Sequence, residues 1–212
     1  MKYGNYNTDD LITALATPWG ESALAVIRTS GDGCIEAVAK VFRGGKDISL
    51  AAGNTMHYGI LADPLSGKTA DEVVAGIYRN PKSYTGQDMV ELFCHGSMPG
   101  ITAVMEVLHN AGFRDAEGGE FTLRAFLNGK MDLTRAEAVN EIVKSKSGKA
   151  MELALERLSG VVFKKIDSIK AVISGVLAGI ELQLDYAEDE SDTEAFTDID
   201  KIDNAISMLS EL

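Results

Sequence analysis

The chain has 212 residues, of which 45% are hydrophobic and 25% charged, and its formal net charge is −12. This length allows one large or two modest domains, and the composition is ordinary for a globular protein in water. No apolar run approaches the ~20 residues of a membrane-spanning helix, and the first ten residues lack the apolar core of a signal peptide. These features exclude a membrane protein. The two cysteines, Cys34 and Cys94, are too few for a disulfide framework, which favours a cytoplasmic location.

The negative charge is concentrated near the carboxyl end. From Asp185 to Leu212, ten acidic residues accompany one lysine, so this segment carries −9 and the preceding 184 residues carry −3. Proteins that hold nucleic acid usually present a basic patch, because neutralising phosphates releases counterions. The sequence has no such patch, and we do not expect this chain alone to hold a nucleic acid.

Residues 1–130 combine strand and helix patterns. Short apolar runs predict strands at 24–27, 56–61, 73–78 and 89–94, separated by turn clusters such as Asp63-Pro64 and Thr85-Gly86. Helical spacing predicts helices at 34–42 and 101–111, the second of which ends at Gly112. Interleaved strands and helices are typical of the α+β and α/β classes, and we expect an α+β domain.

Residues 131–212 have a helical pattern, which predicts an all-α segment. Thr134-Arg135-Ala136-Glu137 matches a capping box, in which the threonine hydroxyl and the glutamate bind free backbone N–H groups. A continuous apolar stripe then runs from Leu155 to Leu184 and needs partner helices to cover it. We expect the acidic segment 185–198 to be a loop and residues 199–209 to begin another amphipathic helix. Because no stop signal follows this helix, we expect the chain to be a truncated piece of a longer protein.

Glu91 lies in an otherwise apolar predicted strand. A buried carboxylate is costly unless it is paired and hydrogen-bonded. Its two oxygens suit two parallel N–H donors, such as the ring N–H and exocyclic amine of a pterin, or a guanidinium. Glu91 is therefore either a ligand-binding carboxylate or a residue that faces water from an edge strand or pairs with an arginine.

Two cations are further candidates for a binding site. Arg28 ends the predicted strand 24–27, and by the two-residue period of a strand it shares a face with Leu24 and Val26. It could bind a carboxylate or carbonyl group of a ligand, or it could be a surface arginine that caps the strand. Lys130 comes just before the predicted second domain and could equally be an exposed lysine in a turn.

Several motifs of catalysis and metal binding are missing from the sequence. Gly67-Lys68-Thr69 is not a P-loop, because Ala62 stands where that motif needs a glycine, and the segment is typical of a hairpin turn. The three histidines lack the spacing of zinc ligands, and we expect His95 to fix the turn at Gly96 or to line a pocket beside Glu91. No serine lies in a nucleophile elbow, and Cys34 is expected to be a small apolar residue of a helix.

Five short segments form a specific combination from about Asp10 onward. They are Ala16-Thr17-Pro18-x-Gly20, Ile27-Arg28-x-Ser30-Gly31, Ser83-Tyr84-Thr85-Gly86-x-Asp88-x-Val90-Glu91-Leu92, Gly119-Glu120-Phe121-Thr122 and Arg124-Ala125-Phe126-Leu127-Asn128-Gly129-Lys130. With these segments the chain resembles the amino-terminal domain and the first part of the helical domain of the tRNA-modifying GTPases called MnmE or TrmE.

The resemblance implies that residues 1–130 form a folate-binding and dimerisation domain, similar to the folate domain of aminomethyltransferases. Its cofactor would be 5-formyl-tetrahydrofolate or a related reduced folate, and Arg28, Glu91 and Lys130 match the folate-binding positions of the family. Residues 131–212 would be a partial helical domain. The GTPase domain that binds GTP, Mg²⁺ and K⁺ in family members is missing, so we expect no GTP hydrolysis by this chain.

The resemblance also implies partners for the full-length protein. Family members form homodimers through the amino-terminal domain and act with the flavoprotein MnmG on the wobble uridine of certain tRNAs, with the folate as the one-carbon source. Binding of tRNA is expected only in that full complex.

Two positions depart from the family pattern. Ser97 replaces the second glycine of a His-Gly-Gly-Pro segment, and it would distort the turn after Glu91 if that position needs a positive φ. Gly118 replaces a proline, which would loosen the loop before Gly119. If these changes removed the folate site, the chain would be a dimerisation and docking module without folate. A stand-alone one-carbon transferase is a third hypothesis, but no general base or nucleophile supports it.

Overall fold

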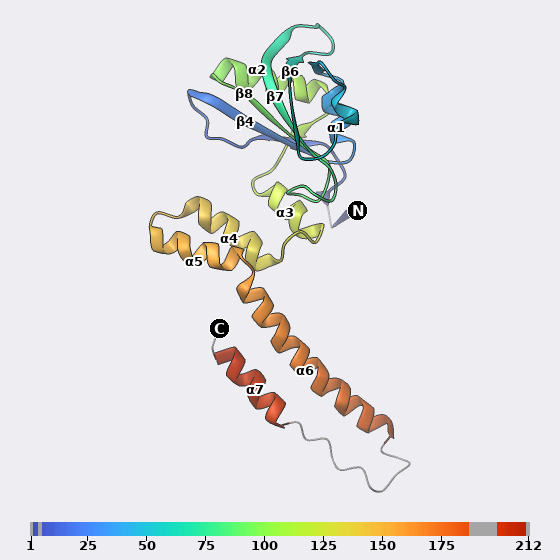
Figure 1. Ribbon diagram of the computed structural model, residues 1–212, viewed down its shortest axis with the longest axis vertical. Helices are drawn as coiled ribbons and strands as arrows, with labels where there is room; N and C mark the ends of the chain where they lie inside the picture. The colour runs from blue at the N-terminus through green and yellow to red at the C-terminus, as the bar shows by residue number, and fades with distance from the viewer. Residues whose placement is uncertain (1, 4–5, 187–198, 211–212) are drawn as a thin grey trace. The chain divides into compact units, whose positions relative to one another are not determined.

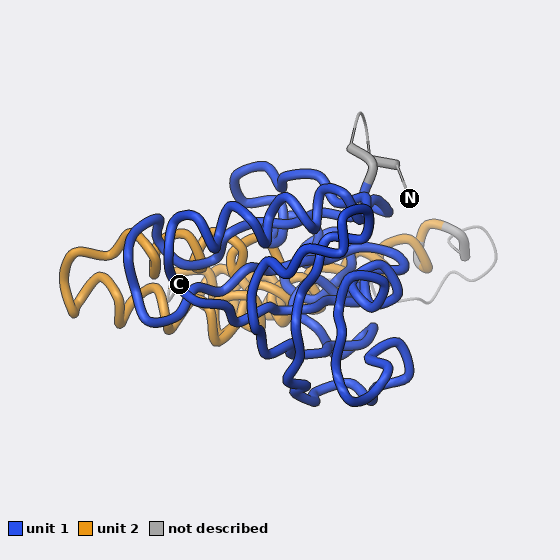
Figure 2. The backbone as a smooth tube through the Cα atoms, turned by 90° about the horizontal axis from the view of Figure 1, so that it is seen from above, with its two compact units in different colours: residues 1–131 blue, residues 132–212 orange. Residues whose placement is uncertain are grey.

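The computed structural model describes residues 2–3, 6–186 and 199–210 of the chain. The chain divides into two compact units, Met1–Met131 (unit 1) and Asp132–Leu212 (unit 2) (Figure 2). Strands and helices alternate in unit 1, whereas the described part of unit 2 is helical (Figure 1). The expected class, an α+β domain followed by an all-α segment, is confirmed.

A seven-stranded sheet forms the centre of unit 1, with the strand order β5-β6-β7-β8-β4-β3-β9. All neighbouring strands are antiparallel except β3 and β9, which are parallel. The strands are β3 (Ile12–Leu15), β4 (Ser22–Ser30), β5 (Phe42–Gly44), β6 (Thr55–Ala62), β7 (Thr69–Tyr78), β8 (Met89–Gly96) and β9 (Arg114–Asp115). A separate pair joins β1 (Lys2–Tyr3) to β2 (Tyr6–Asn7).

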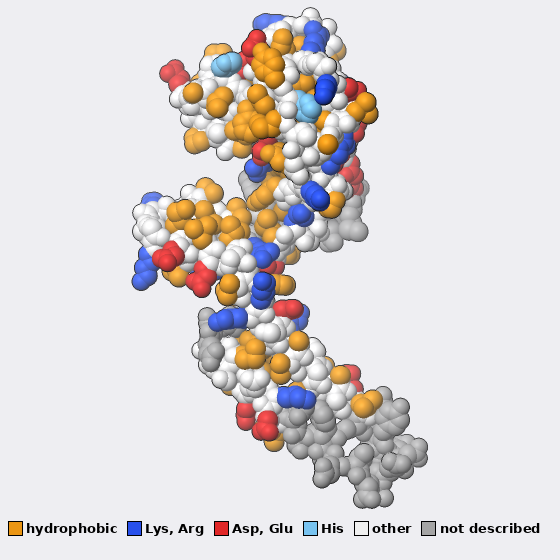
Figure 3. All heavy atoms as spheres, viewed as in Figure 1, with side chains coloured by type: hydrophobic (Ala, Val, Ile, Leu, Met, Phe, Trp, Pro, Cys, Tyr) orange, Lys and Arg blue, Asp and Glu red, His pale blue; other side chains and the backbone are white. Residues whose placement is uncertain are grey.

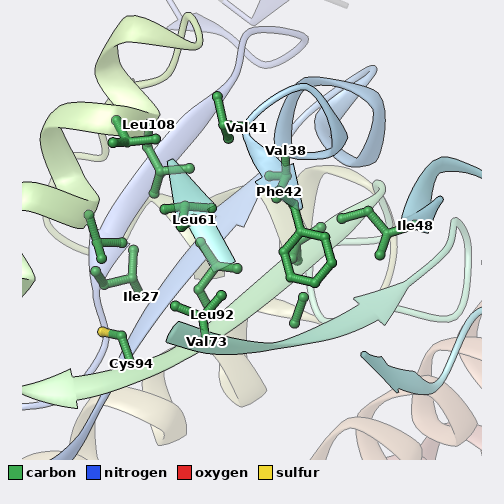
Figure 4. Packing of buried hydrophobic residues seen from close by; sticks show 14 of the residues in the cluster. Ile27, Val38, Val41, Phe42, Ile48, Leu61, Val73, Leu92, Cys94 and Leu108 are labelled. Atoms are coloured by element: carbon green, nitrogen blue, oxygen red, sulfur yellow. The ribbon is translucent and has the colours of Figure 1, made fainter. Parts of the chain in front are cut away.

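The hydrophobic core lies between one face of this sheet and two helices, α1 (Cys34–Ala39) and α2 (Met98–Asn110). Because side chains alternate along a strand, Ile27 of β4, Val73 of β7 and Leu92 of β8 point to the same face. They are buried there together with Val38 of α1 and Leu108 of α2 (Figure 4). Each fully buried aliphatic side chain stabilises the fold by roughly 1.5–3 kcal/mol relative to exposure, so this layer holds the sheet and the helices together.

The opposite face of the sheet exposes large apolar side chains. Leu24 is 60% exposed, and Met56 and Tyr58 are each 64% exposed. Together with the half-buried Val74 and Phe93 they line a cavity of about 370 Å³, and we call these five residues the open apolar face. Figure 3 shows hydrophobic side chains gathered over these strands. An apolar surface of this kind commonly marks an interaction site.

At β4 and α1 the element bounds of unit 1 differ from the sequence prediction. β4 continues to Ser30, so Arg28 lies within the strand and does not end it. α1 ends at Ala39, because the chain turns there and Phe42 pairs with Leu61 at the start of β5. The segment after Asp63 is the predicted hairpin turn, in which the Asp63 carboxylate accepts the backbone N–H groups of the next residues.

Unit 2 contains four helices in its described part, α4 (Leu133–Lys144), α5 (Gly148–Leu158), α6 (Val161–Tyr186) and α7 (Ile199–Ser210). The predicted capping box at Thr134 is wrong. Asp132 caps α4 by accepting the backbone N–H of Arg135 at 3.0 Å, and the Thr134 hydroxyl donates to the same carboxylate. Asp and Thr are both good caps, and the sequence alone does not rank two candidates so close together.

The predicted apolar stripe from Leu155 to Leu184 does not belong to one helix. Gly160 has φ +80°, a left-handed conformation that favours glycine, and it separates α5 from α6. The Arg135 side chain packs against Gly160 and donates to the Ser159 carbonyl at 3.1 Å, so the turn is held to the start of α4. The apolar spacing continues across the turn, which is why the pattern concealed the break.

None of the helices in the described ranges, including the 26-residue α6, is long and apolar enough to cross a bilayer. Asp185 and Tyr186, the first residues of the predicted acidic loop, continue α6. The remainder of that prediction, residues 187–198, lies outside the described residues. The predicted last helix is confirmed as α7.

Candidate functional site

Arg28 and Glu91 are direct neighbours on adjacent strands. They lie opposite each other in the antiparallel pairing of β4 with β8, on the face away from the core. The Arg28 Nε–H donates to Glu91 Oε1 at 2.8 Å, and Nη2 lies 2.8 Å from the same oxygen. The Arg28 side chain is 29% exposed and that of Glu91 is 16% exposed. Because two guanidinium nitrogens contact one of its oxygens, the Glu91 carboxylate is held in a fixed orientation.

Glu91 Oε2 has more freedom to accept hydrogen bonds. The Tyr78 hydroxyl lies 3.4 Å from it, which is long for an O–H···O bond. Tyr78 reaches Glu91 across Gly76, which lies opposite Glu91 on β7 and has no side chain in the way. Burial and the nearby Glu91 carboxylate raise the pKa of Tyr78, so its hydroxyl stays protonated and can donate. Oε2 is therefore the part of the pair that can accept N–H groups from a ligand.

Two aromatic rings lie beneath the Arg28 guanidinium. Its central carbon is 5.1 Å from the centre of the Tyr84 ring and 5.7 Å from that of Phe121. Tyr84 comes from the loop between β7 and β8, and Phe121 from α3 (Glu120–Leu127). The Tyr84 hydroxyl and the Thr122 hydroxyl are 2.9 Å apart, so the loop and α3 are joined beside the rings. Cation–π contacts of this length stabilise by about 0.5–2 kcal/mol.

Lys130 contacts the loop that carries Tyr84. Its Nζ donates to the Pro81 carbonyl at 2.8 Å, and its aliphatic chain lies over Gly86. Gly86 has φ +80°, and a Cβ at this position would be 3.1 Å from Lys130 Cγ, so a glycine fits both the turn and the lysine. The three predicted site residues thus belong to one connected region, with Arg28 and Glu91 in contact and Lys130 joined to them through the loop of Tyr84.

The structure answers some of the alternatives left open for these residues, and ligand binding by Arg28, Glu91 and Lys130 stays a prediction. Glu91 pairs with an arginine, and the edge-strand alternative is wrong because β8 lies between β7 and β4. Arg28 shares the open side of β4 with Leu24 and Val26, as the strand period predicted. Sequence reasoning missed Tyr78, Tyr84 and Phe121. Tyr84 and Phe121 lie inside the sequence segments that carry the family resemblance. An aromatic residue in such a segment was the sequence feature that could have identified them as part of the site.

His95 pairs with Asp71 of β7, a contact that the sequence did not predict. Its Nδ1 lies 2.8 Å from an Asp71 carboxylate oxygen, and its backbone N–H donates to the other oxygen of that group at 2.8 Å. The hydrogen bond to Asp71 raises the pKa of His95. His95 contributes to the cavity at the open apolar face, not to the surroundings of Arg28 and Glu91. The described residues contain no cluster of histidine, cysteine and carboxylate side chains that could hold a metal ion.

The two departures from the family pattern have limited structural effect. Ser97 has φ −92° and caps α2, with its hydroxyl accepting the Gly100 N–H at 3.2 Å. Ser97 therefore does not distort this turn, because its φ is negative. The serine begins a helix instead, and α2 starts at Met98 and not at the predicted residue 101. In the loop before α3, Gly119 has φ +81° and takes the left-handed conformation. At Gly118 a Cβ would meet no atom within 4 Å, so a side chain would fit at that position.

A buried ion cluster holds α3 in place. The Glu120 carboxylate, 4% exposed, accepts hydrogen bonds from Arg114 at 2.7 Å and 2.8 Å, from Arg124 at 2.9 Å and from the Glu117 N–H at 2.9 Å. Burial alone would raise the pKa of Glu120, but these hydrogen bonds outweigh it and lower the pKa to about 2. The charged form is therefore the one that stabilises the folded protein.

Acid should weaken unit 1 through Glu120. The folded-state pKa of about 2 is below the ordinary value of 4.5, so this stabilisation is complete above pH 4.5 and is lost as the pH falls towards 2. We expect Glu120→Gln to reduce the free energy of unfolding by roughly 3 kcal/mol at pH 6, and to reduce it less at pH 3. Urea denaturation over a pH series measures this difference. Asp115→Asn, at an exposed carboxylate on β9, is the control, and an equal, pH-independent loss for Glu120→Gln would contradict the argument.

The groups at the site are of the kinds that suit a flat, polar ligand. A carboxylate oxygen with one long hydrogen bond, a partly exposed cation and aromatic rings occur together, and among these residues no nucleophile lies beside a base. Cys34 is no candidate nucleophile, because burial raises the pKa of its thiol to about 12. A cavity of about 690 Å³ lies elsewhere, beside α1, and none of the three predicted residues lines it.

Comparison with known proteins places the chain in a family. Residues 11–130 match the family described as the GTP-binding protein TrmE N-terminus, and residues 133–212 match the MnmE helical domain. The tRNA modification GTPase MnmE of Treponema denticola is 44% identical over 212 residues, covering 100% of this chain and 45% of the relative. That of Borreliella burgdorferi is 48% identical over 185 residues, covering 87% of this chain and 40% of the relative. That of Carboxydothermus hydrogenoformans is 44% identical over 207 residues, covering 95% of this chain and 45% of the relative. The chain thus spans less than half the length of these relatives, and it belongs to the MnmE (TrmE) family of tRNA modification GTPases.

Proposed function

We propose that this chain is the folate-binding and dimer-forming part of a tRNA modification GTPase. In this proposal unit 1 binds a reduced folate of the 5-formyl-tetrahydrofolate type and pairs two protomers, and unit 2 is the first part of the helical domain. The observation that carries the proposal is the Arg28–Glu91 pair lying against Tyr84 and Phe121. The folate, when bound, supplies a one-carbon unit for the modification of a tRNA base.

The residues of the site fit a folate. A pterin has a ring N–H and an exocyclic amine side by side, and Glu91 Oε2, whose partner in the structure is the Tyr78 hydroxyl at 3.4 Å, has acceptor capacity for such donors while Arg28 occupies Oε1. The rings of Tyr84 and Phe121 favour a planar ligand beside them. Lys130 adds a cation at the edge of the same region, suited to the carboxylates of a folate tail. No residue of the site needs to act as an acid or base for this binding role.

Dimerisation is proposed for the open apolar face. Leu24, Met56 and Tyr58 are exposed there, and the carboxylates nearby, Glu72 and Asp71, already have partners in Tyr58 and His95. A surface that is apolar at its centre and polar at its rim suits a second protein surface better than a nucleic acid. Contacts with an MnmG-like flavoprotein and with tRNA, and hydrolysis of GTP with Mg²⁺ and K⁺, belong in this proposal to the full-length protein, acting in the cytoplasm.

Calorimetric titration with 5-formyl-tetrahydrofolate tests the folate proposal. We expect micromolar binding by the chain, with a heat of binding that is lost when Glu91 is replaced. A folded, dimeric chain that binds no reduced folate would contradict it.

The alternative function is a dimerisation and docking module without folate, which the open apolar face favours. The two are distinguished by heating the chain with and without the folate. A ligand that binds only the native state raises the free energy of unfolding by about 2.7 kcal/mol when its concentration is one hundred times its dissociation constant. A folate site therefore predicts a higher melting temperature with folate, and a docking module without a folate site predicts no change.

A further inference from the structure

The geometry around Arg28 depends on two segments that are distant in the sequence. The Tyr84 ring belongs to the loop before β8, and the Phe121 ring belongs to α3, yet both lie against one guanidinium. The hydrogen bond between the Tyr84 and Thr122 hydroxyls is only half-buried. A firmer connection is needed to keep both rings in place.

Arg124 makes that connection from the interior. It lies on α3 three residues after Phe121, and its side chain is 1% exposed. Its guanidinium donates to Glu120 Oε1 at 2.9 Å, to the Asp10 carbonyl at 2.8 Å and to an Asp10 carboxylate oxygen. Nη1 also lies 3.3 Å from Gln87 Oε1, and Gln87 belongs to the Tyr84 loop. One side chain thus links α3, the segment before β3 and the loop.

Gln87 extends these bonds towards the site. Its Nε2 donates to the Thr8 carbonyl at 2.6 Å, and its Oε1 accepts the Ser30 hydroxyl at 3.3 Å. The Ser30 hydroxyl lies 2.7 Å from that of Thr85. Ser30 is two residues from Arg28 on β4, and Thr85 is the residue after Tyr84. Arg28, Tyr84 and Phe121 therefore each lie within two residues of a member of this buried network.

We propose that Arg124 is a positioning residue of the folate site, acting through Gln87 and α3 to hold Tyr84 and Phe121 against Arg28. This inference deepens the folate proposal and rests on it for the ligand. A buried cation is costly to maintain, and apolar side chains of similar volume often stabilise a core as well or better. A guanidinium is the side chain that can reach three segments at once with fixed geometry.

The experiment compares Arg124→Lys with Arg114→Lys. Both changes keep a charge and remove the planar fork, and both arginines bind Asp10 and Glu120, but only Arg124 contacts Gln87. The first measurement is the NMR chemical shift of the Arg28 Nε–H proton without ligand, which the ring currents of Tyr84 and Phe121 displace. The second is the dissociation constant for 5-formyl-tetrahydrofolate.

We expect Arg124→Lys to move the Arg28 proton towards the shift of a free arginine and to weaken folate binding about tenfold, as for coupled neighbouring residues. Arg114→Lys, which loses contacts to Glu120 of α3 but none to Gln87, should change the Arg28 shift and the folate affinity less than Arg124→Lys does. An unchanged Arg28 shift, or equal effects of the two variants, would overturn the inference. If the shift responds but the wild-type chain binds no folate, the positioning role stands and the folate proposal fails. Gln87→Met, with the same expected results, replaces Arg124→Lys if that variant does not fold.

Discussion

Replacing Glu91 with alanine is expected to weaken binding of 5-formyl-tetrahydrofolate about 100-fold. The change removes the acceptor for the pterin N–H groups, and hydrogen bonds to a charged group contribute about 1.5–3 kcal/mol each, so a loss near 2.7 kcal/mol is expected. It also frees the Arg28 guanidinium, which Glu91 Oε1 holds through two 2.8 Å contacts. The loss should therefore combine a missing contact with a less ordered cation. Isothermal titration calorimetry measures it directly.

Two further variants separate this effect from general damage to the sheet. Glu72→Ala removes another carboxylate that accepts a tyrosine hydroxyl from a strand, that of Tyr58 at 2.9 Å, and it should leave folate affinity unchanged. Glu91→Gln keeps the shape and one acceptor oxygen but replaces the other by an NH₂ donor, so we expect an intermediate loss. Wild-type affinity in Glu91→Ala would show that the folate binds elsewhere.

Local patterns in the sequence were sufficient for much of unit 1. Short apolar runs between turn residues predicted β6, β7 and β8 to within a few residues, and the two-residue period of a strand placed Arg28 on the side away from the core. These predictions succeed because both signals depend only on residues that are close together in the sequence. The break at Gly160 was missed because the sequence pattern shows only local spacing. The apolar spacing of α5 and that of α6 happen to continue each other across this single left-handed residue.

The contacts inside the site could not be predicted in the same way. Arg28 meets Glu91 because of the register between β4 and β8, and these two residues are 63 positions apart. Register is set by the whole hydrophobic pattern of the sheet, not by the residues that meet. The approach of Phe121 to Arg28 depends in addition on the buried hydrogen bonds of Arg124. Arg124 belongs to one of the family segments, but its contacts are visible only in the folded chain.

Replacing Gly31 with alanine is expected to lower the stability of unit 1 by about 3 kcal/mol, or its melting temperature by roughly 10 °C. Gly31 has φ +140°, and a Cβ there would lie 2.4 Å from the Asp10 carbonyl oxygen. That oxygen accepts a hydrogen bond from Arg124, so relief of the clash must displace a buried partner of the network as well. The position thus combines backbone strain, a steric clash and a lost hydrogen bond.

Gly33→Ala is the matched control for this prediction. Gly33 also has a positive φ, +73°, but a Cβ there would meet no atom within 4 Å, so only the backbone cost of about 1 kcal/mol remains. Near-ultraviolet circular dichroism follows the unfolding of unit 1, which contains the single tryptophan and five of the six tyrosines. Equal losses in the two variants would mean that the contact with Asp10 contributes nothing. A larger loss in Gly31→Ala, together with weaker folate binding, would connect the packing at Asp10 to the Arg28 site, because Arg124 is the one side chain in the described residues that the Asp10 carbonyl and Gln87 share.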